Sequence, residues 1–154
     1  MSVETLVRPE INPDEEYDLQ VLFDDVVKRE TDHHPELNSR RKKLIFIQKT
    51  FEWWNVAEVA NILKVTEKET RRFLSRRGIR TNEFEEIEEQ FNGVFAITSI
   101  IAKHVEGLLP RRDTLAKPNG LLENWGVKAV LINGDIKEAV KVAQMTYDKY
   151  HREN

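Results

Sequence analysis

Residues 55–80 constrain the fold most, because two stretches with helical spacing of apolar residues meet there across a junction of two residues. Asn55 is a suitable cap for the first stretch. Thr66 and Glu69 form a capping-box sequence that begins the second, and Gly78 is suited to end it. The residues expected to face inward are Val56, Val59, Ala60, Leu63, Phe73 and Leu74. The pattern predicts a helix-turn-helix.

The same stretch concentrates positive charge. Lys68, Arg72 and Arg76 recur every fourth residue and share one helix face, where like charges repel and add nothing to folding. Residues 37–82 contain 12 Lys and Arg against 4 Glu, a net charge of +8, whereas the residues before them carry −8 and those after them −3. A basic middle between acidic flanks is typical of an anion-binding surface, and nucleic-acid phosphate is the commonest such anion.

The string from Val59 to Leu74, V-A-N-I-L-K-V-T-E-K-E-T-R-R-F-L, adds a family likeness. It resembles the helix-turn-helix of MerR-type regulators, phage excisionases and resolvase-like DNA-binding domains, whose recurring form is V-A-x-L-L-G-V-S-x-x-T-V-R-R-Y-L. Lys64 replaces the turn glycine, so a positive φ there would carry strain. Thr70 replaces an apolar residue. The resemblance implies double-stranded DNA as the ligand.

We therefore expect residues 37–81 to be a DNA-binding domain, with the helix from Glu67 to Arg77 in the major groove. Arg71 or Arg72 is the preferred contact to guanine, because an arginine can bond bidentately to that base. The candidate DNA-contacting residues are Arg40, Arg41, Lys42, Lys43, Lys64, Thr66, Lys68, Arg71, Arg72, Ser75, Arg76, Arg77 and Arg80.

The segments before this domain are acidic. Residues 1–12 lack periodicity and are expected to be a mobile arm, and residues 13–36 predict an acidic helix to about Lys28 followed by a turn. Residues 31–35, Thr-Asp-His-His-Pro, resemble part of the active-site signature of pterin carbinolamine dehydratases, and two adjacent histidines also suggest a metal. The rest of that signature is missing, because residues 38–54 predict a helix capped by Asn38 or Ser39. A solvated turn is expected.

A long helix is predicted over residues 82–109, where apolar residues alternate spacings of three and four. Asn92 and Gly93 mark a point where it can kink. The apolar seam needs a cover, either from the first and last helices of the same chain or from a second subunit. Helix-turn-helix proteins usually act as symmetric oligomers, so self-association is expected. The seam comprises Phe84, Ile87, Phe91, Val94, Ile101, Val105 and Leu108.

The remaining segments are predicted from their turn residues. Residues 110–126 read as a linker, with Pro118, Asn119 and Gly120 as a turn. Residues 127–154 form a C-terminal helical segment, in which the run 127–132 fits either a helix or a strand. Asp135 is placed to cap the last helix.

Several functional classes are not indicated. The chain contains no cysteine, which excludes disulfides and thiolate metal sites. No phosphate-binding glycine loop or hydrolase motif is present, and His104 and His151 are far apart in sequence, so no enzyme, metal or cofactor is expected. No signal peptide and no apolar run of about 18 residues is present, which predicts a soluble cytoplasmic protein without membrane contact.

The expected fold class is mainly α: a small helix-turn-helix core, a long following helix and a C-terminal helical segment. The expected function is that of an oligomeric DNA-binding regulator of transcription in a bacterium or phage. One alternative is a DNA-packaging subunit similar in architecture to phage small terminase subunits. Another is an adaptor that binds proteins, and a protein partner at the acidic first helix or the C-terminal segment is a further option.

Overall fold

The structure is a computed structural model that describes residues 13–37, 39–51, 55–75, 81–108 and 117–152. These residues form eight helices and no strand, which confirms the mainly α fold class. The helices are α2 (Pro13–His33), α3 (Arg40–Phe51), α4 (Val56–Leu63), α5 (Glu67–Phe73), α6 (Thr81–Leu108), α7 (Lys117–Asn124), α8 (Val127–Ile132) and α9 (Ile136–Arg152).

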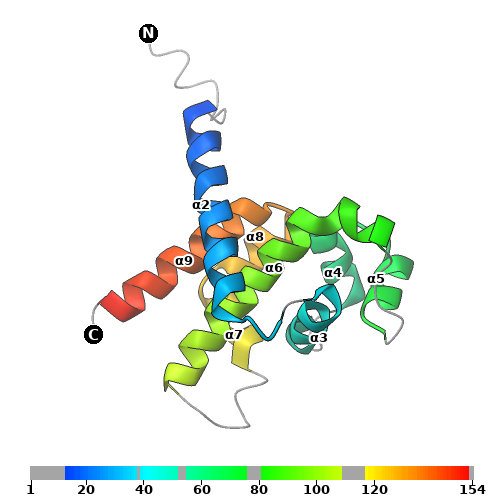
Figure 1. The fold of residues 1–154 in the computed structure, drawn as a ribbon. Helices are drawn as coiled ribbons and strands as arrows, with labels where there is room; N and C mark the ends of the chain where they lie inside the picture. The colour runs from blue at the N-terminus through cyan, green and yellow to red at the C-terminus, as the bar shows by residue number, and fades with distance from the viewer. Residues whose placement is uncertain (1–12, 38, 52–54, 76–80, 109–116, 153–154) are drawn as a thin grey trace.

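The long helix α6 is the centre of the molecule, with α2 and α9 packed on one side of it and α3 and α4 on the other (Figure 1). The predicted seam is therefore covered by the chain itself, and each of its five described side chains is at most 6% exposed. These five are Ile87, Phe91, Val94, Ile101 and Val105. The side chains of Phe84 and Leu108 lie outside the description. The seam is core and not a free oligomerisation surface, and self-association itself stays a prediction.

Helix α6 is continuous, without a break at Asn92 and Gly93. Gly93 instead allows α9 to approach closely. A Cβ atom at this position would lie 2.6 Å from Cδ1 of Ile136 and 3.2 Å from the ring of Phe23, both shorter than ordinary van der Waals contact. The glycine is thus explained by helix packing.

The predicted linker is wrong in its second half, because residues 117–124 form α7. Leu122 of this helix and Trp125, which follows it, lie in the core. Pro118 lies in the first turn of that helix, where the missing N–H is not needed, so a helix start was mistaken for a turn. Residues 127–132 are helical, and α9 begins directly after Asp135, as predicted.

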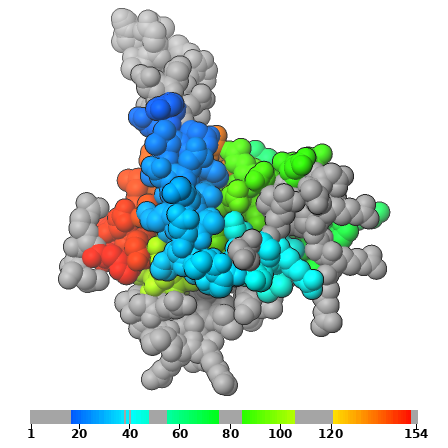
Figure 2. Space-filling view, viewed as in Figure 1, coloured from blue at the N-terminus to red at the C-terminus, as the bar shows by residue number. Residues whose placement is uncertain are grey.

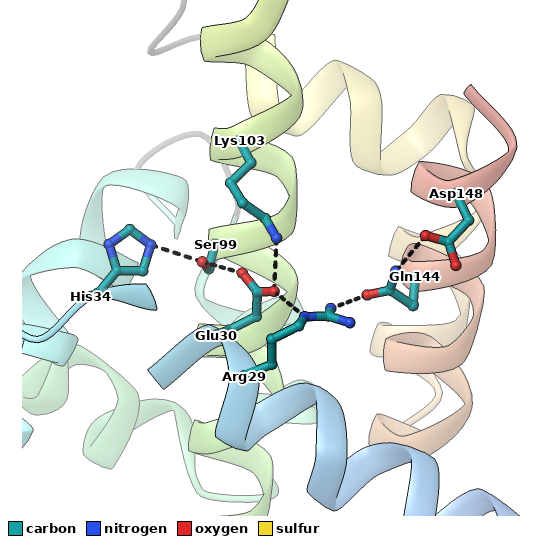
Figure 3. A network of polar contacts seen from close by, with 7 residues as sticks. All are labelled: Arg29, Glu30, His34, Ser99, Lys103, Gln144 and Asp148. Carbon is teal, nitrogen blue, oxygen red and sulfur yellow. Dashed lines mark hydrogen bonds and ion pairs between the residues drawn. The ribbon is translucent and has the colours of Figure 1, made fainter. Parts of the chain in front are cut away.

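Helix α2 runs to His33, further than predicted, so the expected turn begins only at His34, where Leu37 N donates to His34 O (2.9 Å) and Pro35 and Glu36 are exposed. Glu30 is completely buried between α2 and α6 (Figure 3). Its carboxylate accepts hydrogen bonds from Ser99 Oγ (2.7 Å), Lys103 Nζ (2.8 Å) and Arg29 Nε (2.9 Å). Burial raises the pKa of this carboxyl, but these three donors outweigh burial and leave the pKa below its ordinary value.

The network extends from Glu30 in both directions (Figure 3). Nε2 of His34 lies 2.8 Å from Ser99 Oγ, so this histidine is anchored to α6 and half-buried. On the other side, Arg29 donates to Gln144 Oε1 in α9, and Gln144 donates to Asp148 (2.7 Å). The network therefore joins α2 to both α6 and α9.

Candidate nucleic-acid interface

Both helices of the predicted helix-turn-helix begin with reciprocal capping. At α4, Glu58 N donates to Asn55 Oδ1 (2.8 Å) while Asn55 N donates to Glu58 Oε1 (3.1 Å). At α5, Glu69 N donates to Thr66 Oγ1 (3.0 Å) and Thr66 N donates to Glu69 Oε1 (3.2 Å). Each box satisfies two backbone donors that a helix start leaves free, so local sequence fixes where both helices begin. The second box confirms the prediction.

The turn between α4 and α5 contains the strain that the sequence implied. Lys64 has φ 58° and ψ 44°, and among the described residues it is the one non-glycine residue with a positive φ. This conformation costs a residue with a Cβ atom about 1–2 kcal/mol. The turn is closed by Val65, whose N–H donates to Ala60 O (3.1 Å).

Helix α5 is shorter than predicted, because it ends at Phe73 and not at Arg77. Beyond this end, the N–H of Ser75 (3.1 Å) and its hydroxyl (2.6 Å) both donate to the carbonyl of Arg72, three residues earlier. Gly78 and three candidate contacts, Arg76, Arg77 and Arg80, lie outside the described residues.

Four candidate contacts meet at α5 and the residues that follow it. Lys68, Arg71, Arg72 and Ser75 line one open hollow of about 550 Å³ together with Glu69. Lys68 and Arg71 are exposed, while Arg72 and Ser75 are half-buried. The acidic residues of this helix are partly engaged: Glu69 in the capping box, and Glu67 in an exposed pair with Arg71 at 4.0 Å. Thr66 is exposed, but its hydroxyl serves the cap.

The basic residues at the start of α3 do not all face solvent. Arg41 and Lys42 are exposed, and Ser39 caps the helix by accepting from Lys42 N (3.2 Å). Lys43 turns inward, with Nζ 5.0 Å from the centre of the Phe95 ring of α6. Burial lowers the pKa of Lys43, although Glu88 opposes that change. Lys43 is therefore a poor phosphate contact. The side chain of Arg40 lies outside the description.

The basic middle of the sequence and its acidic flanks lie in different parts of the structure. Figure 1 shows α3, α4 and α5 gathered on one side of α6, away from α9 and from the N-terminal half of the acidic helix α2. The hydrophobic core nevertheless runs from α2 to α9 and includes Leu44, Ile47, Val59 and Phe73 of the predicted DNA-binding domain. The helix-turn-helix thus stands on a core that the whole chain builds.

The structure brings together two histidines that the sequence separates. Nδ1 of His104 in α6 lies 3.2 Å from Nε2 of His151 in α9, beside the rings of Trp125 and Tyr150. Burial, with a smaller effect of His151, lowers the pKa of His104. Within the described ranges, no group of three or more His, Asp or Glu residues is placed to hold a metal ion.

In the part of the chain that the structure describes, no helix has both the length and the apolar character that a membrane span requires. Comparisons of the chain with family models, with curated proteins and with solved structures found no match. The likeness of residues 59–74 to the MerR-type motif therefore stays a prediction.

Proposed function

We propose that this protein binds double-stranded DNA through the α4–α5 pair, with α5 in the major groove, and that it regulates transcription in a bacterium or phage. The observation that carries the proposal is the grouping of Lys68, Arg71, Arg72 and Ser75 around one hollow on α5. Arginine and lysine pair with guanine and with phosphate, and serine bonds to either.

The local geometry supports this use of α5. Two short helices, each with a capping box, are joined by the tight turn at Lys64, and the turn keeps a left-handed lysine despite its cost. Arg41 and Lys42 at the start of α3 supply further exposed cations from the same basic segment. In this proposal Arg71 or Arg72 reads guanine, and the other cations hold phosphates.

The test replaces Arg71 and Arg72 with Ala and measures binding to mixed-sequence duplex DNA by fluorescence anisotropy. A charge-matched control replaces Lys28 and Lys149, exposed cations of α2 and α9. We expect the first double variant to bind at least about tenfold more weakly, since one good bidentate contact contributes about 1–3 kcal/mol. The control should bind like the wild type.

Circular dichroism must show that both variants are folded. Wild-type affinity in a folded Arg71→Ala, Arg72→Ala variant would remove α5 as the reading helix. Equal losses of affinity in both double variants would instead indicate that DNA binding depends on the net charge of the protein alone.

A further inference from the structure

Helix α5 presents fewer side chains to solvent than its sequence suggested. Glu67, Lys68 and Arg71 are exposed, whereas Thr70 and Phe73 are completely buried. Glu67 and Arg71 lie one helical turn apart on the same face, and their side chains are 55% and 65% exposed. A helix that enters the major groove reads bases with the side chains of its exposed face. These three residues are therefore the first candidates for base contacts, and Glu67 is not among the predicted ones.

The other polar side chains in and beside α5 are already engaged. The Thr66 hydroxyl accepts from Glu69 N (3.0 Å) and donates to Glu69 Oε1 (2.9 Å), so the capping box occupies both side chains. Arg72 is half-buried, and its guanidinium lies 5.5 Å from the centre of the Phe73 ring. The Ser75 hydroxyl donates to Arg72 O (2.6 Å). Of the two arginines proposed to read guanine, Arg71 is the one that the fold presents to a base.

The exposed carboxylate of Glu67 is unfavourable for binding the DNA backbone. It repels phosphates and therefore weakens binding to duplexes of every sequence. At the base edges, by contrast, it has a specific partner, because the N4 amino group of cytosine is a donor in the major groove. Adenine also has an amino group there, but the N7 acceptor beside it repels a carboxylate. The chemistry of Glu67 thus favours cytosine over the other three bases.

The distance between Glu67 and Arg71 suits contacts to neighbouring bases. Arg71 Nη2 lies 4.0 Å from Glu67 Oε1. Successive bases of one strand are about 3.4 Å apart along the duplex, so two side-chain ends this close reach positions within one base-pair step of each other. An exposed ion pair of this kind contributes little to folding, so exchanging it for base contacts costs the protein little.

We propose that Glu67 sets the base specificity of α5 by accepting a hydrogen bond from N4 of a cytosine, while Arg71 donates to O6 and N7 of a guanine within one base-pair step. This inference rests on the proposed DNA-binding function and adds the bases that are read. Phosphate contacts by Lys68 and by the exposed Arg41 and Lys42 of α3 offset the repulsion from Glu67. Figure 2 shows that α3, in cyan, reaches the surface on the α5 side of α2.

The test selects bound duplexes from a library with a randomised central segment and sequences them, using the full-length protein. For the wild type we expect enrichment of a cytosine and a guanine within one step. Glu67→Gln should change the preferred cytosine to adenine, because glutamine bonds bidentately to N6 and N7 of adenine. Arg71→Ala should lose the guanine. By anisotropy, replacing the selected cytosine with thymine, whose O4 is an acceptor, should weaken wild-type binding at least about fivefold and leave Glu67→Gln nearly unaffected.

Glu69→Gln is the matched control, because it removes the same charge from the first turn of α5 and glutamine can still complete the capping box. Both single variants should bind mixed-sequence duplex more tightly than the wild type, since each lacks one repulsive carboxylate. Only Glu67→Gln should change the preferred base. A wild type without the cytosine preference, a Glu67→Gln variant that keeps it, or its loss in Glu69→Gln as well would overturn this inference and leave DNA binding in place. Absence of binding to any duplex would overturn both.

Discussion

Replacing Glu30 with Gln should destabilise the protein by an amount that the structure allows us to estimate. The carboxylate is completely buried and bonds to Lys103, whose side chain is 22% exposed, and to Arg29, whose side chain is 50% exposed. Arg29 is well solvated and contributes little. Lys103 is not, and the variant leaves its ammonium beside a neutral amide. Breaking a buried pair from one side costs about 3–5 kcal/mol, and we expect the lower end, about 3 kcal/mol, because Lys103 keeps some solvent contact.

The loss should depend on pH in a defined direction. The pKa of Glu30 in the folded state lies below its ordinary value of 4.5, because the donors from Lys103, Ser99 and Arg29 outweigh burial. Its stabilising contribution is therefore complete above the pKa of the unfolded state and is lost as the pH falls through the folded pKa. Wild type and Glu30→Gln should differ most near neutral pH, and the difference should shrink as the pH falls below 4.5.

Urea denaturation followed by circular dichroism between pH 7 and pH 3 measures both effects. Asp32→Asn is the matched control on the same helix, because Asp32 is exposed and forms an exposed pair with Lys28 at 3.6 Å. The control should stay within about 0.5 kcal/mol of the wild type. A Glu30→Gln variant as stable as the control at pH 7, or a loss that is constant across the pH range, would refute this account of the network.

Three further predictions concern packing, the turn and assembly. Gly93→Ala should cost about 1–3 kcal/mol in thermal unfolding, because its Cβ atom would overlap Ile136, and adding Ile136→Val should recover part of that loss; no recovery would refute the steric cause. Lys64→Gly should be more stable than Lys64→Ala by about 1 kcal/mol, because alanine keeps the left-handed strain; the opposite order would contradict it. Light scattering should show self-association: a dimer favours a regulator, a ring of eight or more favours DNA packaging, and a monomer with and without DNA contradicts the expectation.

Features set by neighbouring residues were predictable from the sequence, and features set by distant residues were not. Thr66 and Glu69 are three residues apart, so their capping box could be read directly and was found. The strain at Lys64 followed from a lysine at a glycine position. Glu30 is 69 residues from Ser99 in the sequence. The residues near Glu30 do not show that this carboxylate lies on the buried face of α2 and bonds to another helix.

The same distinction explains the other errors. The spacing of apolar residues in α6 identified a buried face and left two covers open, the first and last helices or a second subunit; the structure shows that α2 and α9 pack on it, together with α3 and α4. Pro118 and Gly120 give the same signal in a turn as in the first turn of a helix, so α7 was missed. The contact between His104 and His151 exists only because α9 packs along α6.

The salt dependence of binding to duplex DNA tests the central claim most directly. If α5 and the start of α3 neutralise five or six phosphates, the logarithm of the affinity should fall against the logarithm of the salt concentration with a slope of about −5, measured by anisotropy from about 50 to 200 mM salt. No detectable binding at about 50 mM salt, or an affinity that does not change with salt, would contradict the proposal that this protein binds DNA.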